Sequence, residues 1–258
     1  MSNLLKRRLL QGECLFGAWV ETGSATNVEI LSDQGFDFLV LDLEHGLGGL
    51  GDAVDMLRAA GERTPCIVRV PWNDPVFLKR ILDAGAESLM IPGVETAQEA
   101  AAAVSACRYP PRGRRGYAAS VVRASHYGAI PDYMAGAHED LLLVMQMESA
   151  DAVARAKEIC AVEGVDVPFL GVNDMAGTLG LLEQLDRPAV RALAQQAEEA
   201  MRASGKPFGT VASAGARWQD LAAAGHRLLP VVNDVAMLRD SARAAVAAFR
   251  DHMRDPVA

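Results

Sequence analysis

Two carboxylates near the middle of the chain have the types and spacing of a cation-binding pair. Glu148 ends a short apolar run with Gln146 two residues before it, and Asp174 follows the next apolar run. Side chains two apart on a strand share a face, so Gln146 and Glu148 would point together while Met147 points away. A hard divalent cation, Mg²⁺ or Mn²⁺ rather than Zn²⁺, is the natural counter-charge for such a pair. The alternative is that backbone amides or an arginine bind both carboxylates.

Other polar groups follow neighbouring apolar runs. Asp42, Glu44 and His45 end the second run, and Arg69 ends the third. A histidine titrates near neutral pH and suits the role of general base, particularly where it shares a rim with an arginine and a cation. Asp83 closes a predicted helix, and two interpretations remain open. It either orients the imidazole of His45 or is an ordinary acid at a helix end.

The elements that must position these groups alternate regularly along the chain. Eight strand–helix units in about 250 residues predict a (β/α)8 TIM barrel, in which active sites lie at the carboxyl ends of the strands. A doubly wound open sheet is the alternative. We expect residues 1–258 to form one domain with a short N-terminal helix. The expected strands are 16–21, 36–43, 66–70, 88–92, 141–148, 167–172, 208–212 and 227–232, and the expected helices are 25–34, 50–61, 75–84, 96–107, 149–162, 187–204, 215–224 and 235–252.

Composition excludes several classes of protein. The 258 residues carry a net charge of −8, which argues against nucleic acid or an anionic membrane as the main partner. The four cysteines are far apart and form no C-x-x-C pair, so we expect reduced thiols and a cytoplasmic location. No apolar run reaches 18 residues, so no membrane-spanning helix is expected. The polar residues Gln11–Glu13 interrupt the N-terminal apolar stretch and disfavour a signal peptide.

Lysine placement and one glycine motif narrow the chemistry further. None of the four lysines (Lys6, Lys79, Lys157 and Lys206) lies at the carboxyl end of a predicted strand. This placement disfavours Schiff-base and pyridoxal phosphate chemistry. Residues 46–51 match G-x-G-x-x-G, but the acidic residues just before them would repel a pyrophosphate. We interpret this motif as a flexible rim loop.

Residues 108–140 form an unusually long connection between a predicted helix and the fifth strand. Connections of this length in a compact domain are usually functional or part of an interface. Five arginines lie within its first part, at positions 108, 112, 114, 115 and 123. They would bind a substrate carboxylate or phosphate, or form ion pairs across a subunit interface, and the residues do not decide between the two.

Six segments together resemble the HpcH/HpaI aldolase family. Their order and spacing cover nearly the whole chain. The resemblance implies a barrel of the phosphoenolpyruvate/pyruvate type, a homohexamer with an exchanged C-terminal helix, and a divalent cation (Mg²⁺ or Mn²⁺, with Co²⁺ a further candidate). The segments are GFDFLVLDLEHG (35–46), VRVPWNDP (68–75), LKRILDAGAESLMIP (78–92), RYPPRGRRG (108–116), QMES (146–149) and GVND (171–174).

The resemblance also implies roles for individual residues. It makes His45 the base, Asp83 its charge partner and Arg69 the group that stabilises developing negative charge. Asp42 and Glu44 would support these three. The remaining roles fall on the fifth and sixth strand ends: Glu148 and Asp174 as metal ligands, and Gln146, Asn173 and Asp174 as contacts to the substrate.

The implied reaction is that of a metal-dependent, class II aldolase. It cleaves or forms 4-hydroxy-2-oxo acids through a pyruvate or hydroxypyruvate enolate plus an aldehyde. The family's usual GPxDLS segment reads GVNDMA here, so the loop that shapes the substrate pocket is altered. The alternatives are an acyl-CoA lyase of the citryl or malyl type and a non-catalytic sugar-acid-binding barrel. The aldehyde, the 2-oxo acid, the direction and the preferred metal are left open.

Overall fold

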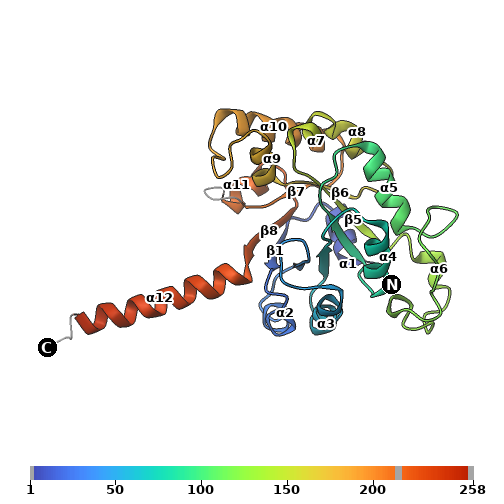
Figure 1. The fold of residues 1–258 in the computed structure, drawn as a ribbon, viewed down its shortest axis with the longest axis horizontal. Helices are drawn as coiled ribbons and strands as arrows, with labels where there is room; N and C mark the ends of the chain where they lie inside the picture. The colour runs from blue at the N-terminus through green and yellow to red at the C-terminus, as the bar shows by residue number, and fades with distance from the viewer. Residues whose placement is uncertain (1–2, 213–216, 255–258) are drawn as a thin grey trace.

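The computed structural model describes residues 3–212 and 217–254, and eight parallel strands in them close into a barrel in chain order (Figure 1). This architecture confirms the predicted (β/α)8 barrel, and all eight strands lie where the apolar runs predict them. The open-sheet alternative is wrong, because β8 pairs with β1. The strands are β1 (Leu15–Val20), β2 (Phe38–Asp42), β3 (Cys66–Arg69), β4 (Ser88–Ile91), β5 (Leu142–Met147), β6 (Val167–Leu170), β7 (Gly209–Thr210) and β8 (Leu228–Asn233).

Helices surround the barrel and differ from the expectation in several places, including the short helix α6 (Tyr133–Gly136) and a 3₁₀ turn within the 108–140 connection. The segment 149–162 forms two helices that meet at Arg155, and a short helix directly after β6 was not expected. Positions 215 and 216 of the expected helix 215–224 lie outside the described residues, and the helix that is described begins at Trp218, after Arg217 as its N-cap. The helices are α1 (Leu4–Leu10), α2 (Ala25–Ser32), α3 (Leu50–Ala60), α4 (Pro75–Asp83), α5 (Ala97–Cys107), α6 (Tyr133–Gly136), α7 (Ala150–Ala154), α8 (Ala156–Ala161), α9 (Val172–Thr178), α10 (Pro188–Ala203), α11 (Trp218–Ala223) and α12 (Asp234–Arg254), with a 3₁₀ turn at Arg123–Ser125.

The strands are apolar on both faces because both faces are buried. Alternate residues such as Val40 and Val144 fill the barrel interior. The residues between them, such as Leu39 and Met145, pack under the helices. Leu5 and Leu9 of α1 belong to the interior cluster, so this short helix closes the amino-terminal end of the barrel.

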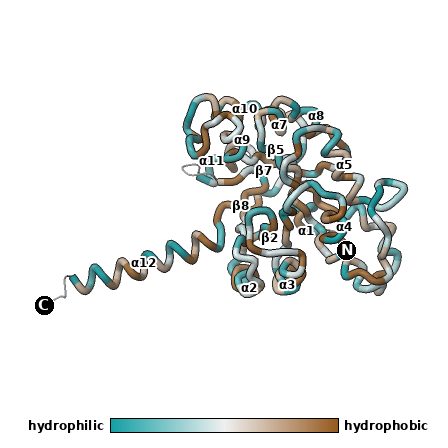
Figure 2. Tube along the Cα trace, viewed as in Figure 1, coloured by the Kyte–Doolittle hydropathy of each residue, from teal (hydrophilic) through white to brown (hydrophobic). Residues whose placement is uncertain are grey.

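The last helix, α12, leaves the barrel and extends away from it (Figure 1). Asp234 is its only buried residue in the part that the structure describes, and apolar and polar residues alternate along its length (Figure 2). Leu238, Phe249 and Met253 are each more than half exposed. No helix among the described residues is long and apolar enough to cross a membrane.

Gly17 lies on the inward face of β1 at a point where the interior has no space for another atom. A Cβ at this position would lie 2.5 Å from the ring of Phe38, which is fully buried on the neighbouring strand. Because Gly17 has no side chain, the barrel interior has room for the aromatic ring of Phe38 beside it.

Gly17→Ala is expected to lower the free energy of unfolding by about 1–3 kcal/mol, because the added methyl overpacks the interior. The cost should shrink when Phe38→Leu is present, as measured by a double-mutant cycle in urea. Gly51→Ala is the matched control, because a Cβ there has no neighbour within 4 Å and the site is helical. An equal cost of Gly17→Ala in both backgrounds would contradict this packing.

Candidate active site

Polar side chains from several strands meet around a cavity of about 270 Å³ at the carboxyl end of the barrel. β1 contributes Trp19 at its end, and the hydrophobic side chain of Val211 lies after β7. The structure thus brings five of the residues predicted from the sequence into one cavity, which we call the mouth. The polar residues lining it are Glu21, His45, Arg69, Gln146, Asn173, Asp174 and Asn233.

Arg69 is held rigidly at the mouth by two carboxylates. Its Nε and Nη2 donate to Oδ1 and Oδ2 of Asp42 at 2.8 and 2.6 Å, and Asp42 is fully buried. Nη1 lies 3.0 Å from Oε2 of Glu44. The Trp19 ring stacks against the guanidinium, 4.5 Å from its carbon to the ring centroid. A guanidinium carries five N–H groups. The hydrogen bonds to Asp42 engage two of them. Nη1 and Glu44 form an ion pair without hydrogen-bond geometry, so both Nη nitrogens keep N–H groups for a substrate oxygen.

Glu148 projects toward the mouth from the end of β5. Met147 packs under the helices, so the alternation along β5 is as predicted. The carboxylate accepts from the Gly93 amide at 2.7 Å and from Nε2 of Gln146 at 2.5 Å. Gly171 faces this pair, and a Cβ there would come within 3 Å of both side chains. The positions of three segments therefore fix where the Glu148 carboxylate lies.

The Glu148 carboxylate lies in an environment that disfavours its charge. Burial raises its pKa to about 7, and the nearby charges of Glu44 and Asp174 add to the rise. The Gly93 amide and Arg69 oppose it, but do not cancel it. Burial likewise raises the pKa of Glu44. The positive charge of Arg69 therefore does not balance the carboxylates on this side of the mouth.

A divalent cation fits this donor set. Glu148 and Asp174 offer carboxylate oxygens, which Mg²⁺ and Mn²⁺ prefer. Burial and the neighbouring carboxylates, which raise the pKa of Glu148, also favour a positive charge beside it. Oε1 of Gln146 is buried without a hydrogen-bond partner among the described residues and adds a polar acceptor there. No group of three or more histidine, cysteine or acidic side chains in the described ranges has metal-binding geometry. The carboxylate pair would therefore leave most coordination positions to substrate and water.

Asn173 and Asp174 lie on α9 rather than in a loop. The helix begins right after β6, and both residues are exposed in its first turn. The orientation of their side chains is set by this short helix. The alternation of residues along β6 does not predict it.

His45 lies at the outer rim of the mouth. Its side chain is 66% exposed, and Nε2 is 3.9 Å from Oε2 of Glu44. Its backbone N–H donates to Oδ1 of Asp42 at 3.4 Å, and that of Glu44 donates to the same oxygen at 3.0 Å. Asp42 therefore positions both Arg69 and the backbone that carries His45.

The prediction that Asp83 charges His45 is not met within this chain. Asp83 ends α4, which starts after β3 and runs back to the amino-terminal end of the barrel. There its Oδ1 accepts from Nη2 of Arg115 at 2.7 Å. The role that the family resemblance implies for Asp83 therefore has no support from the contacts within one chain and stays a prediction.

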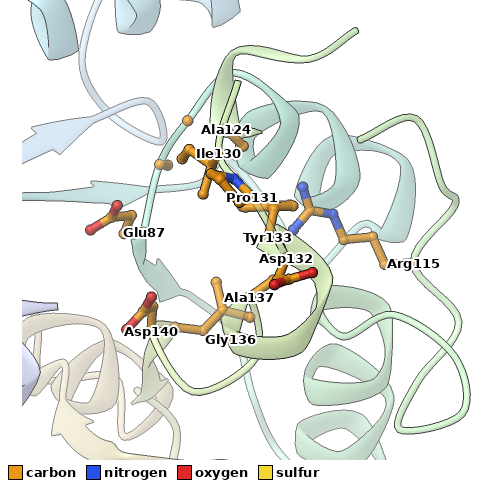
Figure 3. Close-up of a pocket in the computed structure, with 13 residues that line it drawn as sticks. Glu87, Arg115, Ala124, Ile130, Pro131, Asp132, Tyr133, Gly136, Ala137 and Asp140 are labelled. Carbon is orange, nitrogen blue, oxygen red and sulfur yellow. The ribbon is translucent and has the colours of Figure 1, made fainter. Parts of the chain in front are cut away.

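The arginine-rich connection lies at the same amino-terminal end, away from the mouth. Arg115 also stacks on Tyr109, and Arg123 donates to the Ala84 carbonyl at 3.0 Å. Figure 3 shows Arg115 beside a cavity of about 130 Å³ under this connection, across from Glu87 and Asp140. These two arginines bind groups of their own chain, so neither serves as a substrate clamp at the mouth.

Sequence reasoning missed two residues beside the predicted site. Glu21 directly follows β1 and lines the mouth; its position, two residues after the inward-facing Trp19, was the available signal. Trp72 follows β3, and its ring lies so close to Gly93 that a Cβ there would be 3.3 Å away. Nothing in the sequence marks that contact, because it joins two loops.

Glu148→Gln is expected to stabilise the metal-free protein at pH 8 by a few degrees in Tm, and much less at pH 5. The folded-state pKa of about 7 exceeds the ordinary 4.5, so the folded state binds more protons between these values. Stability conferred by that proton is lost as pH rises through 7. Thermal unfolding in EDTA at both pH values tests this, with exposed Glu62→Gln as control. A stabilisation independent of pH would contradict it.

The chain matches the family model for HpcH/HpaI aldolase/citrate lyase over residues 15–241. A hydroxypyruvate/pyruvate aldolase of Chromohalobacter salexigens is 37% identical over 243 residues, which cover 93% of this chain and 95% of that protein. A 4-hydroxy-2-oxovalerate aldolase of Novosphingobium aromaticivorans is 42% identical over 209 residues, covering 80% and 79%.

A solved structure agrees with these sequence matches. An HpcH/HpaI aldolase/citrate lyase family protein from Burkholderia cenocepacia J2315 superposes with a TM-score of 0.92 at 36% identity, covering 96% of this chain and 100% of that one. The resemblance carried by the six sequence segments is thereby confirmed. This chain belongs to the HpcH/HpaI aldolase/citrate lyase family.

Proposed function

We propose that this protein is a class II aldolase that cleaves or forms 4-hydroxy-2-oxo acids, with pyruvate or hydroxypyruvate and an aldehyde as the other reactants. The observation that supports the proposal most is the mouth itself. A guanidinium fixed by Asp42, with N–H groups free on both Nη nitrogens, lies close to the buried carboxylate of Glu148, whose pKa burial and neighbouring carboxylates raise. No lysine lines this cavity among the described residues, which disfavours a Schiff-base aldolase. The aldolase names of the similar proteins agree with it.

Glu148 and Asp174 would hold the divalent cation, Mg²⁺ or Mn²⁺, with Co²⁺ as a further candidate. When bound, the cation supplies Lewis-acid stabilisation to the oxygen on which negative charge develops. Gln146 and Asn173 would contact the 2-oxo acid beside it, since both line the same side of the mouth.

The chain's own residues account for the proton and charge movements of cleavage. His45 takes the proton from the 4-hydroxyl group, and the C4 oxygen becomes the aldehyde oxygen as the C3–C4 bond breaks. The electron pair of that bond moves to C3 and, through the 2-oxo group, forms an enolate. The open N–H groups of Arg69 donate to the enolate oxygen, which is a preorganised form of charge stabilisation. A proton delivered to C3 from water then gives the 2-oxo acid, and His45 releases its proton to solvent.

Two other functions use the same fold. An acyl-CoA lyase of the citryl or malyl type would cleave a thioester substrate, and a non-catalytic barrel would bind a sugar acid without turnover. Assays of free-acid cleavage against thioester cleavage, with and without metal, separate the three. The aldolase proposal expects turnover of free acids only.

We further propose a homo-oligomer, and a hexamer by family resemblance, with α12 as an interface element. Its exposed apolar residues, including Leu238 and Phe249, have no contact in a single chain among the described residues that would bury them. The four free cysteines agree with the proposed cytoplasmic location.

Arg69→Ala and His45→Ala are each expected to lower kcat for cleavage by about 10²–10³-fold, since each removes a group that acts where charge or a proton moves. Steady-state kinetics with pyruvate release as readout measures the loss. Arg58→Ala is the control, because Arg58 is an exposed residue of α3 whose only ion pair among the described residues is with Asp55. Turnover unchanged in both variants would refute the mechanism.

Metal affinity is expected to rise with pH between about 6 and 8. Below its pKa of about 7 the Glu148 carboxyl holds a proton that the cation must displace, so affinity falls up to about tenfold per pH unit. Titration calorimetry with Mn²⁺ in two buffers of different ionisation enthalpy measures both affinity and proton release. Glu148→Gln should remove both the tight binding and its pH dependence, and a pH-independent affinity in the native chain would count against this assignment.

A further inference from the structure

Glu21 is an acidic residue of the mouth that the proposed mechanism does not use. It follows β1 and lies two residues after Trp19, whose side chain points to the barrel interior, so Glu21 faces the same way. Its backbone is held from both sides: the N–H donates to Oδ1 of Asp234 at 2.9 Å, and the carbonyl accepts from the Leu47 N–H at 3.0 Å. Its carboxylate makes no hydrogen bond to any residue in the described ranges.

The position of Glu21 separates it from the groups that would hold the 2-oxo acid. β1 and β5 are four strands apart in a closed barrel of eight, so Glu21 lies across the mouth from Glu148. Arg69 and His45 lie between them in strand order, at the ends of β3 and β2. A 4-hydroxy-2-oxo acid with its 2-oxo group at Arg69 and its 4-hydroxyl at His45 would extend its remaining carbons toward β1.

Charge at this side of the mouth decides what those carbons can carry. The only arginine or lysine lining the mouth among the described residues is Arg69, and Asp42 and Glu44 already neutralise it. Burial raises the pKa of Glu21, and the charges of Asp42 and Asp234 raise it further. A second carboxylate placed here would therefore meet repulsion without a compensating cation. A hydroxyl group would instead find an acceptor oxygen that is not already engaged.

We propose that Glu21 binds hydroxyl groups on the aldehyde half of the substrate, so that the enzyme selects hydroxyaldehydes over aldehydes that carry a carboxylate. This inference rests on the proposed aldolase function and adds the acceptor class to it. A hydrogen bond to a charged acceptor in a partly buried site corresponds to about 10–100-fold in kcat/KM.

The test measures addition of pyruvate to three aldehydes in the presence of Mn²⁺: glyceraldehyde, propanal and succinic semialdehyde. Glyceraldehyde and propanal have the same number of carbons and differ in hydroxyl groups, while succinic semialdehyde carries a carboxylate. The native enzyme should prefer glyceraldehyde over propanal at least tenfold and use succinic semialdehyde least. Glu21→Leu should reduce the glyceraldehyde-to-propanal ratio of kcat/KM toward one.

Glu21→Gln is a second variant that keeps the shape and removes the charge. It should raise the succinic semialdehyde-to-propanal ratio about tenfold while keeping a preference for glyceraldehyde. The matched control is Glu29→Gln, an exposed residue of α2 outside the mouth, which should leave every ratio unchanged.

The outcomes separate the inference from the function on which it rests. If the native enzyme adds pyruvate to none of the three aldehydes with Mn²⁺ or Mg²⁺, the aldolase proposal fails. If it adds pyruvate but the ratios stay the same in Glu21→Gln or Glu21→Leu, the aldolase proposal stands and the role of Glu21 is refuted.

Discussion

The ion pair between Asp42 and Arg69 is the interaction on which the candidate site depends. Asp42 is fully buried and binds two guanidinium nitrogens, and it also accepts from the backbone N–H groups of Glu44 and His45. The two partners face each other directly in the β2–β3 register. One carboxylate thus sets the position of an arginine, a second carboxylate and a histidine. Removing one member of such a pair leaves an uncompensated buried charge, which is strongly destabilising.

The rest of the barrel keeps this end free for polar groups. Leu5 and Leu9 of α1 close the opposite end of the barrel interior. Lys6 of the same helix binds the Leu141 carbonyl and Asp166, which holds α1 against the barrel. The interior between the two ends is filled by apolar side chains. Burial of Glu148 at the polar end is a cost to folding that a cation would offset. Buried charges that lower the stability of the fold are expected at functional sites.

Strand-based features were predictable from the sequence, whereas groups set by helices and loops were not. The alternation of Gln146, Met147 and Glu148 follows from the period of a strand, and the structure shows Met147 on the outer face. The expected helix 149–162 breaks at Arg155, and α9 forms in a segment rich in glycine, asparagine and aspartate. The spacing of apolar residues does not distinguish a helix from a loop in segments of fewer than about eight residues.

Asp83 and Glu21 show the same limit at the level of single residues. The resemblance to the family implied a role for Asp83, but the direction of α4 carries it to the other end of this chain, beside Arg115. Glu21 was visible as the last residue of an expected strand, yet its importance depends on which strands oppose each other in the closed barrel. Closure is a global property, so neighbour relations across the mouth emerge only from the structure.

Conversion of a 2-oxo acid to its enolate at the mouth can be tested by one measurement that needs no knowledge of the aldehyde. The protein is incubated with pyruvate and Mn²⁺ or Mg²⁺ in D₂O, with and without EDTA, and the methyl protons are followed by NMR. We expect loss of the pyruvate methyl signal that requires both protein and metal and is slower in Arg69→Ala. Exchange no faster than in buffer, with either metal, for the methyl protons of pyruvate and for the C3 methylene protons of hydroxypyruvate, would contradict enolate formation at the mouth.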